Sequence, residues 1–195
     1  PVRHRPAAPR GKASGGVGLV YFAGHGVQVR GENFLVSTDS DIRNEDEVPD
    51  DSVNASVILE KMQGAGNRMN IVILDACRNN PLSRSTRSAE VGLAKMDAPT
   101  GSFIAYSTAP GDVAADGSGK NSPYTTALVA AMRQPGMALE ETFRSVRVRV
   151  MAETGKQQVP WESSSLTGAF YFLPANAAKP IDSVAEQDFF KAIKD

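Results

Sequence analysis

The sequence predicts an α/β fold with a mostly parallel central sheet. Two short apolar runs, residues 17–23 and 70–76, lack polar alternation and are typical of strands buried on both faces. A segment with helical periodicity lies between them, and this order implies a right-handed crossover between parallel strands. Hydrophobic residues make up 41% and charged residues 22% of the 195 residues, which is ordinary for a globular domain with a sizeable core.

The first part of the chain predicts a linker, two strands and an acidic loop. Residues 1–16 are polar and rich in Pro, Gly and basic side chains, as flexible linkers are. Residues 17–23 predict the first strand, and residues 33–37 predict a second short strand after an Arg-Gly-Glu turn. We expect these two strands to form a hairpin, followed by an acidic loop over residues 39–51.

A helix and the clearest strand come next. Ser52 is a plausible helix N-cap, and apolar residues from Val57 to Met62 then recur at helical spacing until two glycines end the pattern. Residues 70–76 contain Ile-Val-Ile-Leu in a row, which predicts a central parallel strand. Residues 81–100 are polar and basic, and they predict an irregular connection.

The last part of the chain predicts two strands and two helices. Residues 102–107 form a further apolar strand. Ser122 followed by Pro123 is an N-cap with proline at the first helical position, and it predicts a helix to about residue 133. A second helix over residues 138–153 and a final strand over residues 169–173 follow. One stripe of the second helix is apolar: Leu139, Phe143, Val146 and Val150.

Composition and charge limit the function classes. The net charge of −1 provides no field that would attract nucleic acid or an anionic membrane, so we expect neither as a partner. No apolar run approaches the roughly 20 residues that span a bilayer, and the basic N-terminal residues are not followed by the apolar stretch of a secretory signal. The single cysteine cannot form an internal disulfide, which fits a reducing compartment, and we expect the cytoplasm.

That cysteine and one of the two histidines carry the chemistry. His25 and Cys77 each follow an apolar strand, and in open α/β sheets sites form at the carboxyl ends of strands. A lone cysteine after a strand is usually a small buried side chain. The matched positions favour instead a thiolate nucleophile with a histidine base, and no cofactor is needed for this chemistry. The N–H groups of Gly26 and Cys77 are candidates for an oxyanion hole.

At this point the sequence resembles a known family. Cys77 follows His25 by 52 residues, similar to the histidine-to-cysteine spacing of caspases. Tyr-Phe-Ala-Gly-His-Gly around His25 resembles the histidine motif of the caspase-like clan. Asp-Ala-Cys-Arg-Asn-Asn-Pro around Cys77 resembles the cysteine motif of its bacterial metacaspase-like and paracaspase-like members. Tyr-Ser-Thr-Ala from Tyr106 and Asn-Ser-Pro-Tyr-Thr from Asn121 resemble the start of the small-subunit region.

The resemblance implies a three-layer α/β/α sandwich and a cysteine endopeptidase. It covers residues 17–173, with a large-subunit part to about residue 81, a linker over 82–100 and a small-subunit part over 101–173. Residues 174–195 are similar to a linker and the start of a helical extension. The family begins with a strand and a helix before the histidine strand, and we expect this chain to lack both. A preceding segment or a partner chain would then complete the sheet.

Asp75 predicts the substrate preference. Animal caspases carry Gln two residues before the cysteine and prefer Asp at P1, whereas the similar metacaspases and paracaspases carry an acidic residue that helps to bind basic P1 residues. A carboxylate in a narrow pocket pairs with Arg or Lys and repels Asp. A simple role as a strand-end cap is the alternative for Asp75. We name Asp75, Ala76 and Asp112 as substrate-binding residues, with Asp116 as a weaker candidate.

The acidic loop is a candidate calcium site, because calcium takes several oxygen ligands. Metacaspases often need calcium, and Asp39, Asp50 and Asp51 fall near the positions that their site uses. A solvated acidic loop without a metal is the alternative.

Basic residues between the cysteine strand and the next strand lie where the family is often cut between its subunits. If P1 is basic, this connection is a substrate of the enzyme itself. The candidates for self-cleavage are Arg84, Arg87 and Lys95.

We therefore expect a bacterial, cytoplasmic cysteine endopeptidase that cleaves proteins or peptides after Arg or Lys. The competing interpretation is a catalytically inactive caspase-like interaction or regulatory module, or an inactive fragment of a longer peptidase. An inactive module would be expected to lack His25 or Cys77, and both are present. A different Cys/His hydrolase is a weaker third interpretation.

Overall fold

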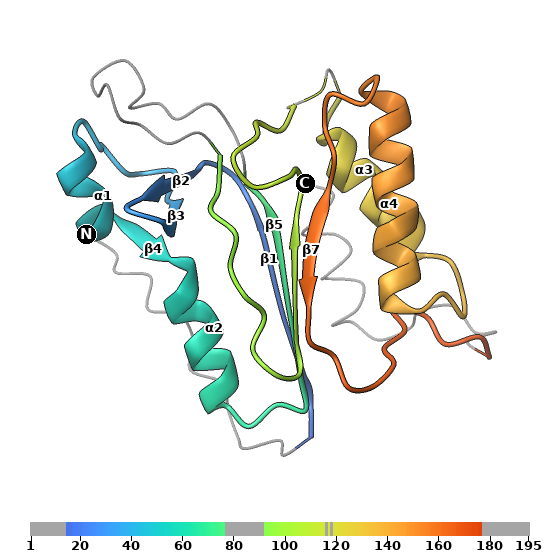
Figure 1. Ribbon diagram of the computed structural model, residues 1–195. Helices are drawn as coiled ribbons and strands as arrows, with labels where there is room; N and C mark the ends of the chain where they lie inside the picture. Colours follow the sequence, from blue (N-terminus) through green and yellow to red (C-terminus); the bar gives the residue numbers. More distant parts are fainter. Residues whose placement is uncertain (1–14, 77–91, 116, 118, 177–195) are drawn as a thin grey trace.

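The structure is a computed structural model, and the part of the chain that it describes comprises residues 15–76, 92–115, 117 and 119–176 (Figure 1). Outside this part lie four residues that the sequence singled out: Cys77, Arg84, Arg87 and Asp116. No described helix is long and apolar enough to cross a bilayer.

The main sheet has four strands, in the order β1 (Val17–Ala23), β5 (Met69–Asp75), β6 (Ser102–Tyr106) and β7 (Trp161–Ser164). The first three are parallel, and β7 runs antiparallel to β6. Every residue of β5 and β6 is buried, because these central strands are covered on both faces. The predicted α/β fold with a mostly parallel sheet is confirmed.

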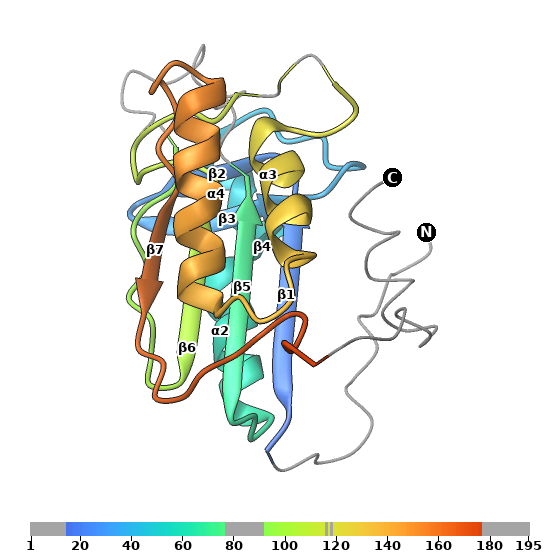
Figure 2. The same cartoon turned by 90° about the vertical axis from the view of Figure 1, so that its right-hand side faces the viewer.

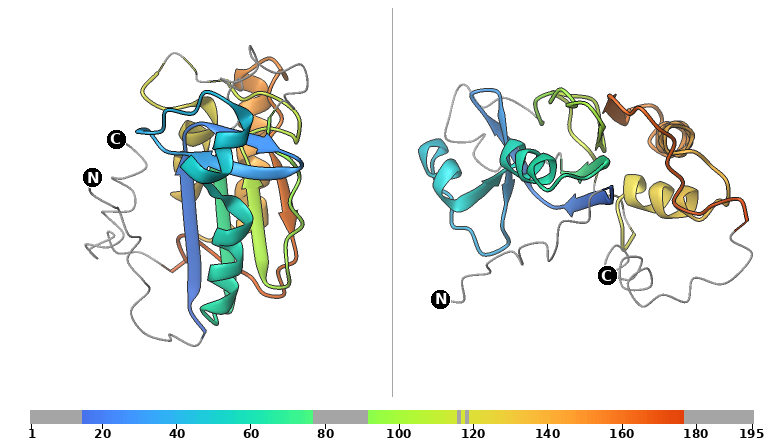
Figure 3. Two further views of the ribbon diagram at one scale, coloured as in Figure 1. Left: turned by 90° about the vertical axis from the view of Figure 1, so that its left-hand side faces the viewer. Right: turned by 90° about the horizontal axis from the view of Figure 1, so that it is seen from below.

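Helices cover both faces of this sheet and make three layers, as the nearly edge-on view of the sheet in Figure 1 and the right-hand view in Figure 3 show, whereas Figure 2 looks onto one face of the sheet. The helix α2 (Ala55–Gly64) lies on one face, and α3 (Pro123–Met132) and α4 (Leu139–Glu153) lie on the other. Alternate residues of β5 divide the core accordingly. Ile71 and Ile73 pack with α3 and α4, whereas Val72 and Leu74 pack with α2.

A second, smaller sheet follows β1. It comprises β2 (Gly26–Val29), β3 (Glu32–Val36) and β4 (Ser52–Asn54) in that order, all antiparallel. The expected hairpin between residues 17–23 and 33–37 is wrong, since β1 pairs with β5 and β3 pairs with β2. The reason is the turn at Arg30 and Gly31, where both φ angles are positive, at 53° and 79°. Such a two-residue turn pairs only the segments directly beside it.

The predicted start of the first long helix is also wrong. Ser52 belongs to β4, where it pairs with Val36, and the helix N-cap is Asn54, whose side chain accepts a hydrogen bond from Ser56 N at 2.8 Å. In this helix Leu59 is buried in the core and Val57 is 41% exposed, so Val57 does not belong to the apolar face as the sequence predicted. The acidic loop before it contains a 3₁₀ turn, η1 (Glu45–Glu47), and a short helix, α1 (Val48–Asp51).

The C-terminal helices agree with the sequence, but the last strand does not. Ser122 is the N-cap of α3, and the four predicted apolar residues of α4 are all buried. The predicted strand over residues 169–173 is reduced to one bridge between Ala138 and Tyr171. β7 instead takes the free edge of β6. Its sequence, Trp-Glu-Ser-Ser, is exposed or half-buried and has no apolar alternation from which a strand could be predicted.

Candidate functional site

His25 lies where the two sheets meet, directly after the carboxyl end of β1. The backbone of its segment is held from both sides: Gly24 N donates to Asp75 O at 3.2 Å, and Val36 N donates to His25 O at 2.9 Å. The histidine side chain is exposed. The backbone of His25 is therefore held by hydrogen bonds, and its side chain is open to solvent. It lies after the strand end that the sequence predicted.

The pairing of β1 with β5 relates this segment to the cysteine motif. Each residue of β1 pairs with the residue 52 positions further along, from Val17 with Met69 to Ala23 with Asp75. The same interval separates His25 from Cys77 in the sequence. Cys77 itself lies outside the described residues.

Gly26 brings the histidine segment against the last described residue of the cysteine motif. A Cβ atom at position 26 would lie 2.7 Å from the carbonyl oxygen of Ala76 and 3.1 Å from the Ala76 Cβ. Ala76 itself is fully buried. Only glycine lets the two backbones approach this closely, which gives a physical reason for the Gly after His25.

Asp75 is buried, with 8% of its surface exposed, and it joins the end of β5 to the start of α3. Its Oδ2 atom accepts hydrogen bonds from the hydroxyls of Ser122 and Thr125, the latter at 2.7 Å. Tyr21 on β1 extends this network, with its hydroxyl 2.5 Å from Thr125 Oγ1. Burial raises the pKa of Tyr21 to about 12, and the nearby Asp75 carboxylate adds to the shift.

The loop after β6 reaches the same end of the sheet and is held by a buried glutamine. Gln158 is 1% exposed; its Nε2 donates to Ser107 O at 2.7 Å and its Oε1 accepts from Ala115 N at 3.1 Å. Asp112, a predicted substrate-binding residue, is exposed on this loop and takes no part in the Asp75 network of the described residues. No pattern near Gln158 in the sequence indicates this role.

Residues 92–98 pack beside this loop and are clamped from the smaller sheet. Asn33 on β3 is 1% exposed, and its side chain donates to Ala94 O and accepts from Ala94 N, both at 2.7 Å. Met96 N donates to Tyr106 Oη at 2.9 Å. Lys95, a candidate for self-cleavage, therefore lies between two held residues, with its ammonium 3.2 Å from Asp97.

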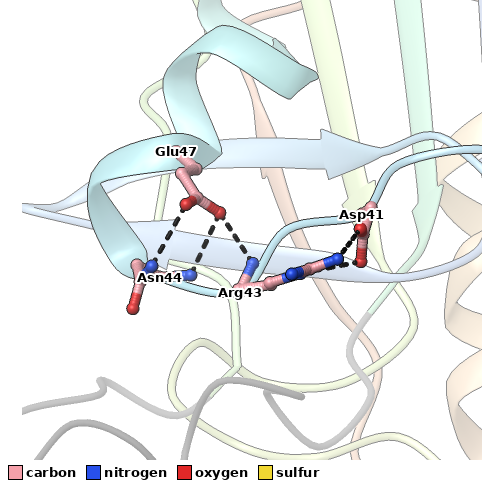
Figure 4. A network of polar contacts seen from close by, with 4 residues as sticks. All are labelled: Asp41, Arg43, Asn44 and Glu47. Carbon is pink, nitrogen blue, oxygen red and sulfur yellow. Dashed lines mark hydrogen bonds and ion pairs between the residues drawn. The ribbon is translucent and has the colours of Figure 1, made fainter.

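The acidic loop is largely engaged in its own hydrogen bonds (Figure 4). The Glu47 carboxylate accepts from the backbone N of Arg43 and of Asn44 and from the Asn44 side chain. These hydrogen bonds lower the pKa of Glu47 below its ordinary value, and the pairing with Asp41 raises that of Arg43.

The three predicted calcium ligands do not form a metal site in this structure. Asp39 accepts from the Ser37 hydroxyl, and Asp50 and Asp51 are exposed on α1. Within the described part of the chain no three His, Cys, Asp or Glu side chains lie together as metal ligands would. Calcium binding stays a prediction.

Comparison with known proteins adds one finding. The model of the caspase domain family (Peptidase_C14) matches residues 5–171 of the chain. A search of curated proteins found no match.

Proposed function

The chain belongs to the caspase domain family, which consists of cysteine peptidases, and on this premise we propose that it hydrolyses peptide bonds with Cys77 as nucleophile and His25 as acid–base group. The β1–β5 register carries the proposal. If the parallel pairing is continued by two residues, position 25 comes opposite position 77, because the interval is 52 residues in both cases. The contact of Gly26 with Ala76 supports the same neighbourhood.

In the proposed reaction His25 removes the thiol proton, and the Cys77 sulfur attacks the carbonyl carbon of the scissile bond. The backbone N–H groups of Gly26 and Cys77 stabilise the oxyanion. The C–N bond then breaks, and His25 returns the proton to the leaving amine. Water hydrolyses the resulting thioester and restores the free thiol.

We propose Arg or Lys at P1, with Asp75 as the acidic partner. The carboxylate is buried at the end of the strand that leads to Cys77, where a charged ligand would find little competing water. Asp112 on the loop after β6 would add negative charge near the opening, and Ala76 would line the pocket with its backbone.

A panel of fluorogenic peptides with Arg, Lys or Asp at P1 tests this function on the full chain, with calcium or with a chelator. We expect the parent protein to cleave the Arg and Lys peptides and the Cys77→Ala and His25→Ala variants to be inactive. His4→Ala, which removes the other histidine, is the control and should keep its activity. Turnover of the Asp peptide alone would refute the role of Asp75. No turnover of any peptide under either condition would favour an inactive interaction module.

Self-cleavage is a further part of the proposal. The backbone next to Lys95 is held by Asn33 and Tyr106, and a protease needs a segment that can extend into its active site. We therefore place the cut after Arg84 or Arg87 rather than after Lys95. Mass spectrometry of the fragments decides this, with the Cys77→Ala protein as the control. A fragment that ends at Lys95, or equal fragmentation of both proteins, would contradict it.

A further inference from the structure

The hydroxyl groups around Asp75 form a chain of hydrogen bonds with one direction. A threonine hydroxyl has a single proton, and an ionised carboxylate only accepts hydrogen bonds. Thr125 Oγ1 lies 2.7 Å from Asp75 Oδ2 and donates its proton there. The contact between Tyr21 and Thr125 must therefore be donated by the tyrosine. Tyr21 thus supports Thr125, and Thr125 supports Asp75.

The two carboxylate oxygens of Asp75 differ in the hydrogen bonds that they accept. Oδ2 accepts from both Ser122 and Thr125, and two donors use the capacity of one carboxylate oxygen. Oδ1 has no hydrogen bond within the described residues. A rotation of the carboxylate would break two hydrogen bonds in a buried place, so the side chain is held in this orientation.

We infer that Ser122 and Thr125 are positioning residues for recognition of P1: they saturate Asp75 Oδ2 and leave Oδ1 as the oxygen that receives the basic side chain. The inference rests on the proposed function, and it makes that function more specific. A guanidinium fork spans both oxygens of a carboxylate when it binds bidentately. With Oδ2 already occupied, Arg loses this advantage over Lys, so the site recognises charge and accepts both.

The alternative is that the two hydroxyls only stabilise the fold, since Ser122 is also the N-cap of α3 and accepts from Thr125 N at 2.9 Å. A purely structural role would change the unfolding temperature but not the ratio of affinities for two ligands. The deciding measurement is therefore a ratio of dissociation constants between peptides that differ only at P1.

The test uses the full chain with Cys77→Ala, so that peptides bind without being cut. Dissociation constants are measured for three peptides with Arg, Lys or citrulline at P1, citrulline being the uncharged isostere of Arg. We expect Arg and Lys to bind within about threefold of each other and citrulline at least about tenfold more weakly, because citrulline can still donate a hydrogen bond but lacks the positive charge that strengthens it.

Thr125→Val removes the hydroxyl at nearly constant volume and frees a place on Oδ2 for a second N–H of Arg, so it should raise the preference for Arg over Lys about tenfold, whereas Thr125→Ser should keep the parental ratio. Thr126→Val is the matched control, because Thr126 is exposed on the same helix. In an Asp75→Asn background Thr125→Val should change the ratio no further, since it acts through Asp75. Should Thr125→Val fail to fold, Ser122→Gly removes the other donor, and glycine remains an acceptable N-cap.

The outcomes separate the inference from the function beneath it. If the parent protein shows no preference for Arg over citrulline, the proposed P1 specificity is wrong and the inference falls with it. If the parent shows the preference and Asp75→Asn abolishes it, but Thr125→Val and Ser122→Gly both keep the parental ratio of Arg to Lys, only the inference is overturned. The inference would also be overturned if the parent protein bound the Arg peptide more than about tenfold more tightly than the Lys peptide, because such a ratio indicates bidentate binding.

Discussion

Gly26→Ala tests whether the close approach of the histidine segment to the cysteine motif matters. The added Cβ would lie 2.7 Å from Ala76 O and 3.0 Å from Leu93 Cδ2, whereas ordinary contacts begin near 3.4 Å. The backbones of Gly26 and Ala76 must therefore separate by about 0.7 Å, or the main chain must tilt by an equivalent amount. Because both residues are buried, neither can move freely into solvent.

The expected consequences follow from this displacement. Overpacking of a buried contact costs about 1–3 kcal/mol of unfolding free energy. A shift approaching 1 Å between catalytic groups reduces the rate by up to about 100-fold. We therefore expect kcat/KM on a P1-Arg peptide to fall about 10- to 100-fold, with a smaller change in KM than in kcat because the P1 contact at Asp75 is not displaced.

The assay pairs steady-state kinetics with urea unfolding, and Gly64→Ala is the matched control. Position 64 is the last residue of α2 and has nothing within 4 Å of an added Cβ, so this variant should keep its activity and gain slightly in stability. Activity of Gly26→Ala within twofold of the parent, together with an unchanged unfolding midpoint, would refute the packing argument for the histidine segment.

Three further predictions concern buried polar groups. Asn33→Leu removes the side chain that pairs with the N–H and C=O of Ala94, so it should lower the unfolding free energy by about 2–4 kcal/mol and speed hydrogen exchange at Ala94. Asn176→Leu, at an exposed position, is the control and should change neither quantity. Equal stability of the two variants would contradict the role of Asn33 in holding Ala94. Burial raises the pKa of Tyr21 to about 12 from 10.0, so its protonated form stabilises the fold fully below about pH 10. This contribution is lost as the pH rises from about 10 to 12. Over this pH range the unfolding free energy of Tyr21→Phe should therefore fall less than that of the parent protein. Gln158→Leu removes the two hydrogen bonds that hold the loop after β6. It should therefore lower kcat/KM on peptides while the unfolding temperature falls by only a few degrees. Unchanged kinetics would show that Gln158 does not contribute to the site.

Some elements could be predicted because local signals agree with the fold. Residues 17–23 form β1 with the predicted bounds, and Ser122 caps α3 as its sequence indicates. Others could not. Ser52 has good cap chemistry, yet it pairs with Val36, and Asn54 begins the helix. Here a tertiary contact outweighs a local preference of only about 1 kcal/mol. β7 has no apolar signal, because only its pairing with β6 makes it a strand.

The candidate site divides in the same way. The motifs around His25 and Cys77 could be found from the sequence, because they follow apolar strands at the spacing of a known family. The partners of Asp75 could not, since Ser122 and Thr125 are 47 and 50 residues away and hydroxyl residues are common in any chain.

By itself the sequence determined the type of fold and the family, and it singled out the residues that we propose for the chemistry, because buried strands and reactive side chains leave local patterns. Only the tertiary structure decided which strands pair, that Gly26 must be small because Ala76 lies against it, and that Ser122 and Thr125 both donate to the same oxygen of Asp75. These features depend on contacts between residues far apart in the chain. Such contacts are selected by packing and by the need to pair buried polar groups, which no local pattern records.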